Sequence, residues 1–120
     1  MRLVTFLGYL NVGLFTIVLL LGYIKTHKAK FSFNVPHINE LHKYLGGSIL
    51  IVGLFHSYLA TGFRYFHPGM LIYAVFLLNI IFIKIFKKTK NKIFFILHTK
   101  IPYLLILMVL GHVLDGLGII

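Results

Sequence analysis

Residues 42–56 read HKYLGGSILIVGLFH, and residues 98–112 read HTKIPYLLILMVLGH. Each stretch lies in a long apolar run and has a histidine at both ends, 14 residues apart. An α-helix turns about 100° per residue, so 14 residues fall only about 40° short of four full turns. In a left-handed bundle the repeat is about 3.5 residues per turn, and this offset disappears. We therefore expect both histidines of a stretch to face the same way, about 21 Å apart along the helix. These residues are His42, His56, His98 and His112.

Composition indicates that the chain is surrounded by lipid. Of its 120 residues, 59% are hydrophobic, and the mean hydropathy of +0.95 is far above that of a soluble domain. The formal net charge is +10, but the basic residues gather in short segments between apolar runs. This pattern is typical of loops at an anionic membrane surface, with membrane lipid as a partner. Nucleic acid is disfavoured as a partner because so little of the sequence is polar.

Four long apolar runs predict four membrane-spanning helices, since about 20 residues cross the hydrocarbon core. The first run lacks the short apolar stretch and the cleavage site of a secretory signal, so we expect it to be a retained helix. We predict an all-α fold, an integral membrane four-helix bundle that forms a single domain over residues 1–120. A flavin- or nucleotide-binding catalytic domain would then have to belong to a partner. The helices are expected at about residues 3–24, 39–63, 69–86 and 93–116.

The distribution of lysine predicts the orientation of these helices. Two of the three connections are rich in lysine, and the positive-inside rule places both of them in the cytoplasm. We therefore expect a multi-pass protein of the cell membrane with both termini external. The second and fourth helices would then run in the same direction, which pairs His42 with His98 and His56 with His112. The basic residues are Lys25, Lys28, Lys30, Lys43, Lys84, Lys87, Lys88, Lys90 and Lys92 on the predicted inner side, and Arg2 and Arg64 on the outer side.

Paired histidines within a membrane favour haem as the ligand. An ionisable residue is expensive in lipid and indicates function. Neutral imidazole binds iron well, and a low-spin haem takes two axial ligands. Zinc needs three or four protein ligands, and no carboxylate is placed to complete such a site. The chain has no cysteine, which excludes iron–sulfur clusters and covalently attached c-type haem. Two b-type haems are therefore the leading interpretation. The alternatives are transport of a bare metal ion, or histidines that pack between the helices of a non-redox structural or assembly subunit.

Small residues accompany the histidines. Gly8 and Gly22 in the first apolar run are also 14 residues apart, and Gly46 and Gly53 lie on the helix that carries His42. We interpret these glycines as room for the edge of a planar ligand at each histidine level. Close packing between helices without a ligand is the alternative interpretation.

Several charged or polar residues near the histidines could assist a bound haem. Lys43 and Lys100 lie within one turn of His42 and His98 and could pair with haem propionates. Further candidates for propionate binding or proton transfer are Glu40, Arg64, His67 and Asp115.

The pattern resembles the four-helix di-haem core of the cytochrome b subunit of quinol-oxidising complexes. In that family, helices two and four carry histidine pairs at this offset, and other helices carry glycines that face the haems. The four histidines match the ligand pattern, and Gly8 and Gly22 match the glycine spacing of the first helix. The chain is also similar to the ferric-reductase-like transmembrane domain. Unlike cytochrome b, it has no glycine pair in the third helix and no quinol-oxidation motif, and its predicted orientation is the opposite one.

The resemblance implies transmembrane transfer of single electrons through two haems b. The inner haem would be bound by His42 and His98, and the outer one by His56 and His112. A membrane quinol, menaquinone or ubiquinone, is a candidate electron donor. A partner redox protein is the other expected donor or acceptor, which would make the chain a subunit of an oxidoreductase. Oligomerisation is left open.

Overall fold

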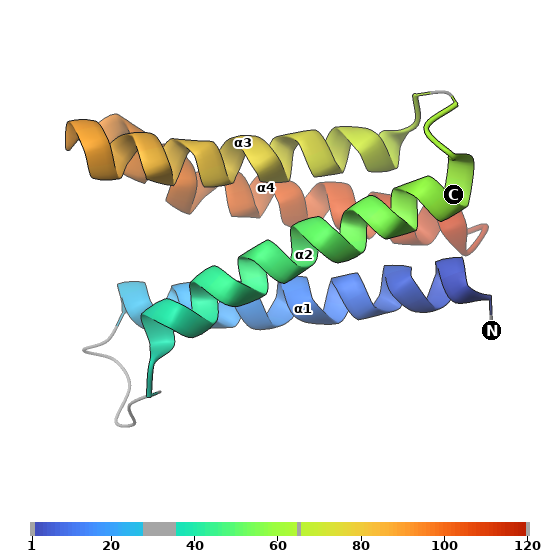
Figure 1. Ribbon diagram of the computed structural model, residues 1–120, viewed down its shortest axis with the longest axis horizontal. Helices are drawn as coiled ribbons and strands as arrows, with labels where there is room; N and C mark the ends of the chain where they lie inside the picture. Colours follow the sequence, from blue (N-terminus) through green and yellow to red (C-terminus); the bar gives the residue numbers. More distant parts are fainter. Residues whose placement is uncertain (1, 28–35, 65, 120) are drawn as a thin grey trace. The chain divides into compact units, whose positions relative to one another are not determined.

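The computed structural model describes residues 2–27, 36–64 and 66–119, and this part of the chain consists of four α-helices without a strand. The helices are α1 (Leu3–Thr26), α2 (Ile38–Thr61), α3 (Pro68–Thr89) and α4 (Lys92–Gly116), as Figure 1 shows. Each is long and apolar enough to cross a membrane. The all-helical prediction with four candidate spans is therefore confirmed, and it is compatible with a multi-pass membrane protein. Lys28 and Lys30, which contributed to the predicted orientation, lie outside the described residues.

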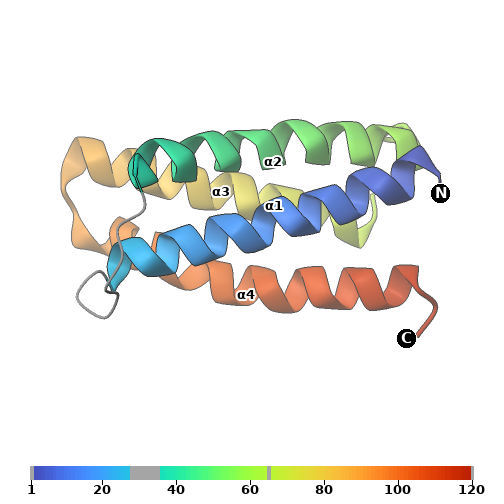
Figure 2. The same ribbon diagram turned by 90° about the horizontal axis from the view of Figure 1, so that it is seen from below.

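The chain divides into two compact units, Met1–Phe63 and Arg64–Ile120. Each unit is a helical hairpin. In the first hairpin α1 and α2 lie side by side and run in opposite directions, and in the second hairpin α3 and α4 do the same (Figures 1 and 2). In the second hairpin this antiparallel pairing follows from the short connection of residues 90 and 91, which returns the chain directly alongside the helix that it has just left.

The start of α1 and the end of α4 match the prediction, and the other six helix ends differ from it by one to three residues. α2 was expected to continue to residue 63, but it ends at Thr61 because Gly62 adopts a left-handed conformation with φ of 63°. The N–H of Gly62 donates to the carbonyl oxygen of Tyr58 at 2.6 Å, which caps the last turn. α1 extends two residues beyond its predicted end, to Thr26, whose Oγ1 donates to the carbonyl oxygen of Gly22 at 2.9 Å.

The largest difference is at α3, which continues to Thr89 instead of ending near residue 86. The sequence interpretation took the lysines after residue 86 as a loop. In the structure Lys87 and Lys88 form the last turn of the helix, where positive charge interacts favourably with the negative end of the helix dipole. Lys90 then adopts a left-handed conformation with φ of 59° and ends the helix.

Asn91 begins α4 by a side-chain cap, in which its Oδ1 accepts the backbone N–H of Ile93 at 3.1 Å. We expect Asn91→Ala to lower the free energy of unfolding by about 1 kcal/mol, because an N–H at the helix start loses its acceptor. Asn91→Ser should retain most of the stability, since serine is also a good cap. Unfolding of both variants in mixed micelles measures the difference. Equal stabilities for the alanine and serine variants would show that the cap contributes nothing.

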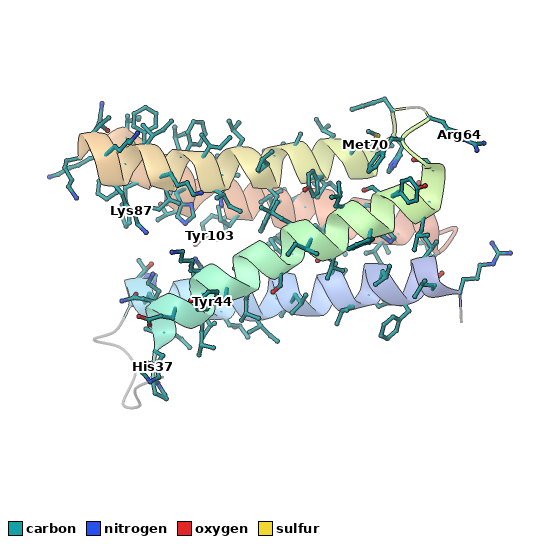
Figure 3. All side chains as sticks on the ribbon, viewed as in Figure 1. His37, Tyr44, Arg64, Met70, Lys87 and Tyr103 are labelled. Carbon is teal, nitrogen blue, oxygen red and sulfur yellow. The ribbon has the colours of Figure 1, made fainter. Side chains whose placement is uncertain are left out.

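Few side chains of the described residues are buried. They include Phe15, Val18 and Ile49 in the first hairpin, and Phe76 and Leu105 in the second. Most large apolar side chains project outward instead, as Figure 3 shows for the whole set of described side chains. Such a surface would be unfavourable in water, but in a bilayer the lipid tails cover it. The exposed apolar side chains of the described helices are thus compatible with a lipid environment.

Candidate functional site

In the first hairpin, the two histidines of α2 lie against the two glycines of α1. A Cβ atom built on Gly8 would lie 3.0 Å from Cε1 of His56, and one built on Gly22 would lie 3.2 Å from Cε1 of His42. The structure thus places Gly8 level with His56 and Gly22 level with His42. The group beside each glycine is the imidazole ring itself. Room for the edge of a planar ligand at these levels stays a prediction.

His56 is fixed by a hydrogen bond to the backbone of α1, in which its Nδ1 lies 2.9 Å from the carbonyl oxygen of Val4. A carbonyl oxygen can only accept, so Nδ1 must carry a proton, and in the neutral ring Nε2 then has the lone pair. Val4 is four residues before Gly8. Because Gly8 has no Cβ, the ring of His56 can approach this carbonyl, which has a second lone pair beside its intrahelical bond.

His98 is held in the same way in the second hairpin. Its Nδ1 donates to the carbonyl oxygen of Asn79 in α3, at 3.0 Å. Asn79 is only 6% exposed, so this carbonyl lies in the interior of the chain and away from competing water. His98 therefore also has its proton on Nδ1 and its lone pair on Nε2. Histidines that bind metal ions commonly donate their other ring N–H to a backbone carbonyl, which fixes the ring and the tautomer.

The ring of His112, a residue of α4, lies beside Gly69 at the start of α3. A Cβ built on Gly69 would lie 3.1 Å from Cε1 of His112 and 2.8 Å from Cε1 of His67. His67 caps α3, because its Nδ1 accepts the backbone N–H of Gly69 at 3.1 Å. Its Nδ1 therefore has no proton, and the neutral ring carries its proton on Nε2. The tautomer of His67 is thus the opposite of that of His56 and His98.

The role of Gly69 and the capping role of His67 were missed by sequence reasoning, which assigned His67 only to propionate binding or proton transfer. A signal was available in the order His67, Pro68, Gly69, because proline favours the first turn of a helix and the residue before it is then the cap. That signal identifies the cap but not the neighbour, His112, which comes from the other helix of the hairpin.

The remaining candidates with charged side chains lie at the surface. Lys43 and Arg64 are exposed, and so are Glu40 and Asp115. Lys100 is exposed as well, with its Nζ 5.9 Å from the ring centroid of Tyr103. Apart from its chain neighbours and the nearby backbone of α2, no described atom lies within 4 Å of a Cβ built on Gly46. Gly53 is buried. Their proposed parts in haem binding stay predictions. The residues concerned are Glu40, Lys43, Gly46, Gly53, Arg64, Lys100 and Asp115.

In the described parts of the chain, no three or more His, Cys, Asp or Glu side chains are grouped so as to hold a metal ion. No protein-family model, curated protein or solved structure matches the chain. The chemistry that its residues can perform is therefore inferred from the histidines and from the backbone groups that hold them.

Proposed function

We propose that the chain is a membrane cytochrome that binds two b-type haems non-covalently. His42 and His98 are the axial ligands of one haem, and His56 and His112 are those of the other. The observation that supports this proposal best is the hydrogen bond that His56 and His98 each make through Nδ1 to a backbone carbonyl oxygen. Metal-binding histidines commonly make this hydrogen bond with one ring nitrogen and bind the metal with the other. His56 belongs to one proposed pair and His98 to the other.

The donor set fits haem iron. A b-type haem takes two neutral imidazoles as axial ligands, and when bound it accepts and releases single electrons. All four histidines are half-buried in helices of high hydropathy. In the first hairpin the rings of His42 and His56 lie at two separate levels, marked by Gly22 and Gly8. The spacing of 14 residues separates these levels by about 21 Å along the helix.

Two such levels suit the passage of electrons across a membrane. Single electrons would pass from a donor on one side, with a membrane quinol as the candidate, to an acceptor or a partner redox protein on the other side. The apolar helices would exclude water and ions from the route that the electrons take. The proposed orientation has both termini outside, with His42 and His98 at the inner level.

A non-redox structural or assembly subunit is the second candidate, and one observation favours it. The hydrogen bonds from His56 and His98 to carbonyl oxygens each join the two helices of a hairpin. Such bonds would strengthen helix packing without any ligand. This candidate predicts a stable, colourless protein, whereas the cytochrome proposal predicts haem.

Purified full-length protein distinguishes the two candidates. For a cytochrome we expect sharp b-type bands in the reduced-minus-oxidised spectrum, and about two haems per chain by the pyridine haemochrome method. Protein produced with ample haem supply but containing less than one haem per chain would contradict the pairing of the histidines. A well-folded protein without haem would favour the structural subunit.

A further inference from the structure

Five exposed lysines surround the connection between α3 and α4. We call this group the lysine turn, and only two residues, 90 and 91, separate the helices there. In Figure 3, Lys87 lies at this end of the second hairpin, and Arg64 lies at the opposite end. The members of the lysine turn are Lys84, Lys87, Lys88, Lys90 and Lys92.

The chain itself cannot neutralise the lysine turn. Its whole sequence contains only two acidic residues, Glu40 and Asp115. Asp115 lies in α4, 23 residues after Lys92, which corresponds to about 35 Å along the helix. Glu40 could balance at most one of the five charges. At least four ammonium groups are therefore left without an acidic side chain of this sequence to pair with, and they can bind anions from outside the chain.

The position of the lysine turn defines which anions can reach it. Two aromatic pairs join α3 and α4 directly beside the lysines, with ring centroids 5.9 Å apart for Phe82 and Phe94 and 5.3 Å apart for Phe86 and Phe95. Lys84 is exposed and lies one helical turn before Lys88, so it is the member of the lysine turn farthest from the connection along α3. When such a helix spans a bilayer, a long lysine side chain can extend along the apolar surface and bring its ammonium group to the phosphate level. The Cα atoms of Lys84 and Lys88 are about 6 Å apart along the axis of α3.

We propose that the lysine turn binds the phosphate groups of anionic phospholipids. Lipid phosphates lie at the depth that a lysine reaches from inside a membrane-spanning helix, and they surround the helix on all sides. An acidic protein approaching from water would meet only the outermost lysines, and it would leave Lys84 without a partner. This proposal requires insertion of the second hairpin into a bilayer, but it does not depend on haem binding.

Spin-labelled lipids test the proposal directly. The full-length protein is reconstituted into phosphatidylcholine bilayers that contain a trace of nitroxide-labelled phosphatidylglycerol or nitroxide-labelled phosphatidylcholine. The fraction of motionally restricted label in the electron spin resonance spectrum gives the relative association of the two lipids with the protein. We expect the wild-type protein to favour phosphatidylglycerol by at least about twofold at low salt, and this preference should weaken as salt rises.

Matched variants locate the site. Lys87→Gln/Lys88→Gln should lower the preference towards equal binding, whereas Lys87→Arg/Lys88→Arg should keep it, because glutamine and arginine are both good helix formers and only one retains the charge. Arg2→Gln/Lys25→Gln removes the same charge from the other hairpin and should leave most of the preference. An equal loss in this last variant would contradict a local site. Equal binding of both lipids by the wild-type protein would overturn the proposal and leave the lysines to an acidic protein partner.

Discussion

Replacing His112 by alanine is expected to remove one haem and leave the other, so that haem content falls from about two per chain to about one. His56 would be the only remaining ligand of its pair, and a single imidazole cannot give six-coordinate low-spin iron. The pair formed by His42 and His98 shares no ligand with the lost site and lies about 21 Å away along the helix. The bands of that haem should therefore persist in the reduced-minus-oxidised spectrum.

Two further variants make this prediction specific. His37→Asn removes an exposed imidazole at a position with φ of 56°, a conformation that asparagine tolerates, and haem content should not change. His67 lies beside His112 but uses its Nδ1 for the cap of α3, so we expect it not to replace the lost ligand. His67→Asn/His112→Ala, with asparagine as the new cap, should then contain as much haem as His112→Ala alone. Two haems in the single variant, reduced to one in the double variant, would contradict the assignment of His112.

Replacing Gly8 by a larger residue should lower the haem content by about as much as His112→Ala does. A Cβ at this position would lie 3.0 Å from the ring of His56, so Gly8→Leu must displace the ring and break its hydrogen bond to Val4. We expect loss of about one haem per chain, because His56 can no longer present Nε2 in a fixed direction. Gly22→Leu should act in the same way on the haem bound by His42.

Gly13→Leu is the control for this experiment. Gly13 lies on the same helix, α1. Apart from its chain neighbours and the nearby backbone of that helix, no described atom comes within 4 Å of a Cβ built there. Its haem content should stay close to that of the wild type. Combining Gly8→Leu with His112→Ala should remove no more haem than either change alone, because both act on the same pair. Unchanged haem in both Gly8→Leu and Gly22→Leu would reduce these glycines to a role in helix packing.

Much of this arrangement could be predicted from periodicity. The equal spacing of two histidines in α2 and two glycines in α1 predicts matching levels once the helices are adjacent and antiparallel, and Gly8 and Gly22 do lie beside His56 and His42. Helix ends were less predictable at the lysines after residue 86. Lysine charge indicates the membrane surface, but it is equally compatible with the last turn of a helix and with a loop.

The tautomers of the histidines could not be predicted in this way. They depend on which backbone carbonyl each ring meets, and this is determined by the axial register and by the rotamer of the side chain. Val4 and Asn79 contribute only their carbonyl oxygens to His56 and His98, so their side chains give no signal in the sequence. The contact of His112 with the start of α3 likewise depends on the residue at which that helix begins, Pro68.

Electron transfer across a sealed bilayer tests the central claim most directly. Liposomes containing the purified, haem-loaded protein are prepared with a reductant trapped inside and an impermeant acceptor outside. Because the protein can insert in both directions, the experiment is repeated with the reductant outside and the acceptor inside. The wild-type protein should reduce the acceptor, and His112→Ala, shown beforehand to retain one haem, should transfer almost no electrons. Undiminished transfer in that variant, or no transfer by wild-type protein that contains both haems, would contradict a two-haem path across the membrane.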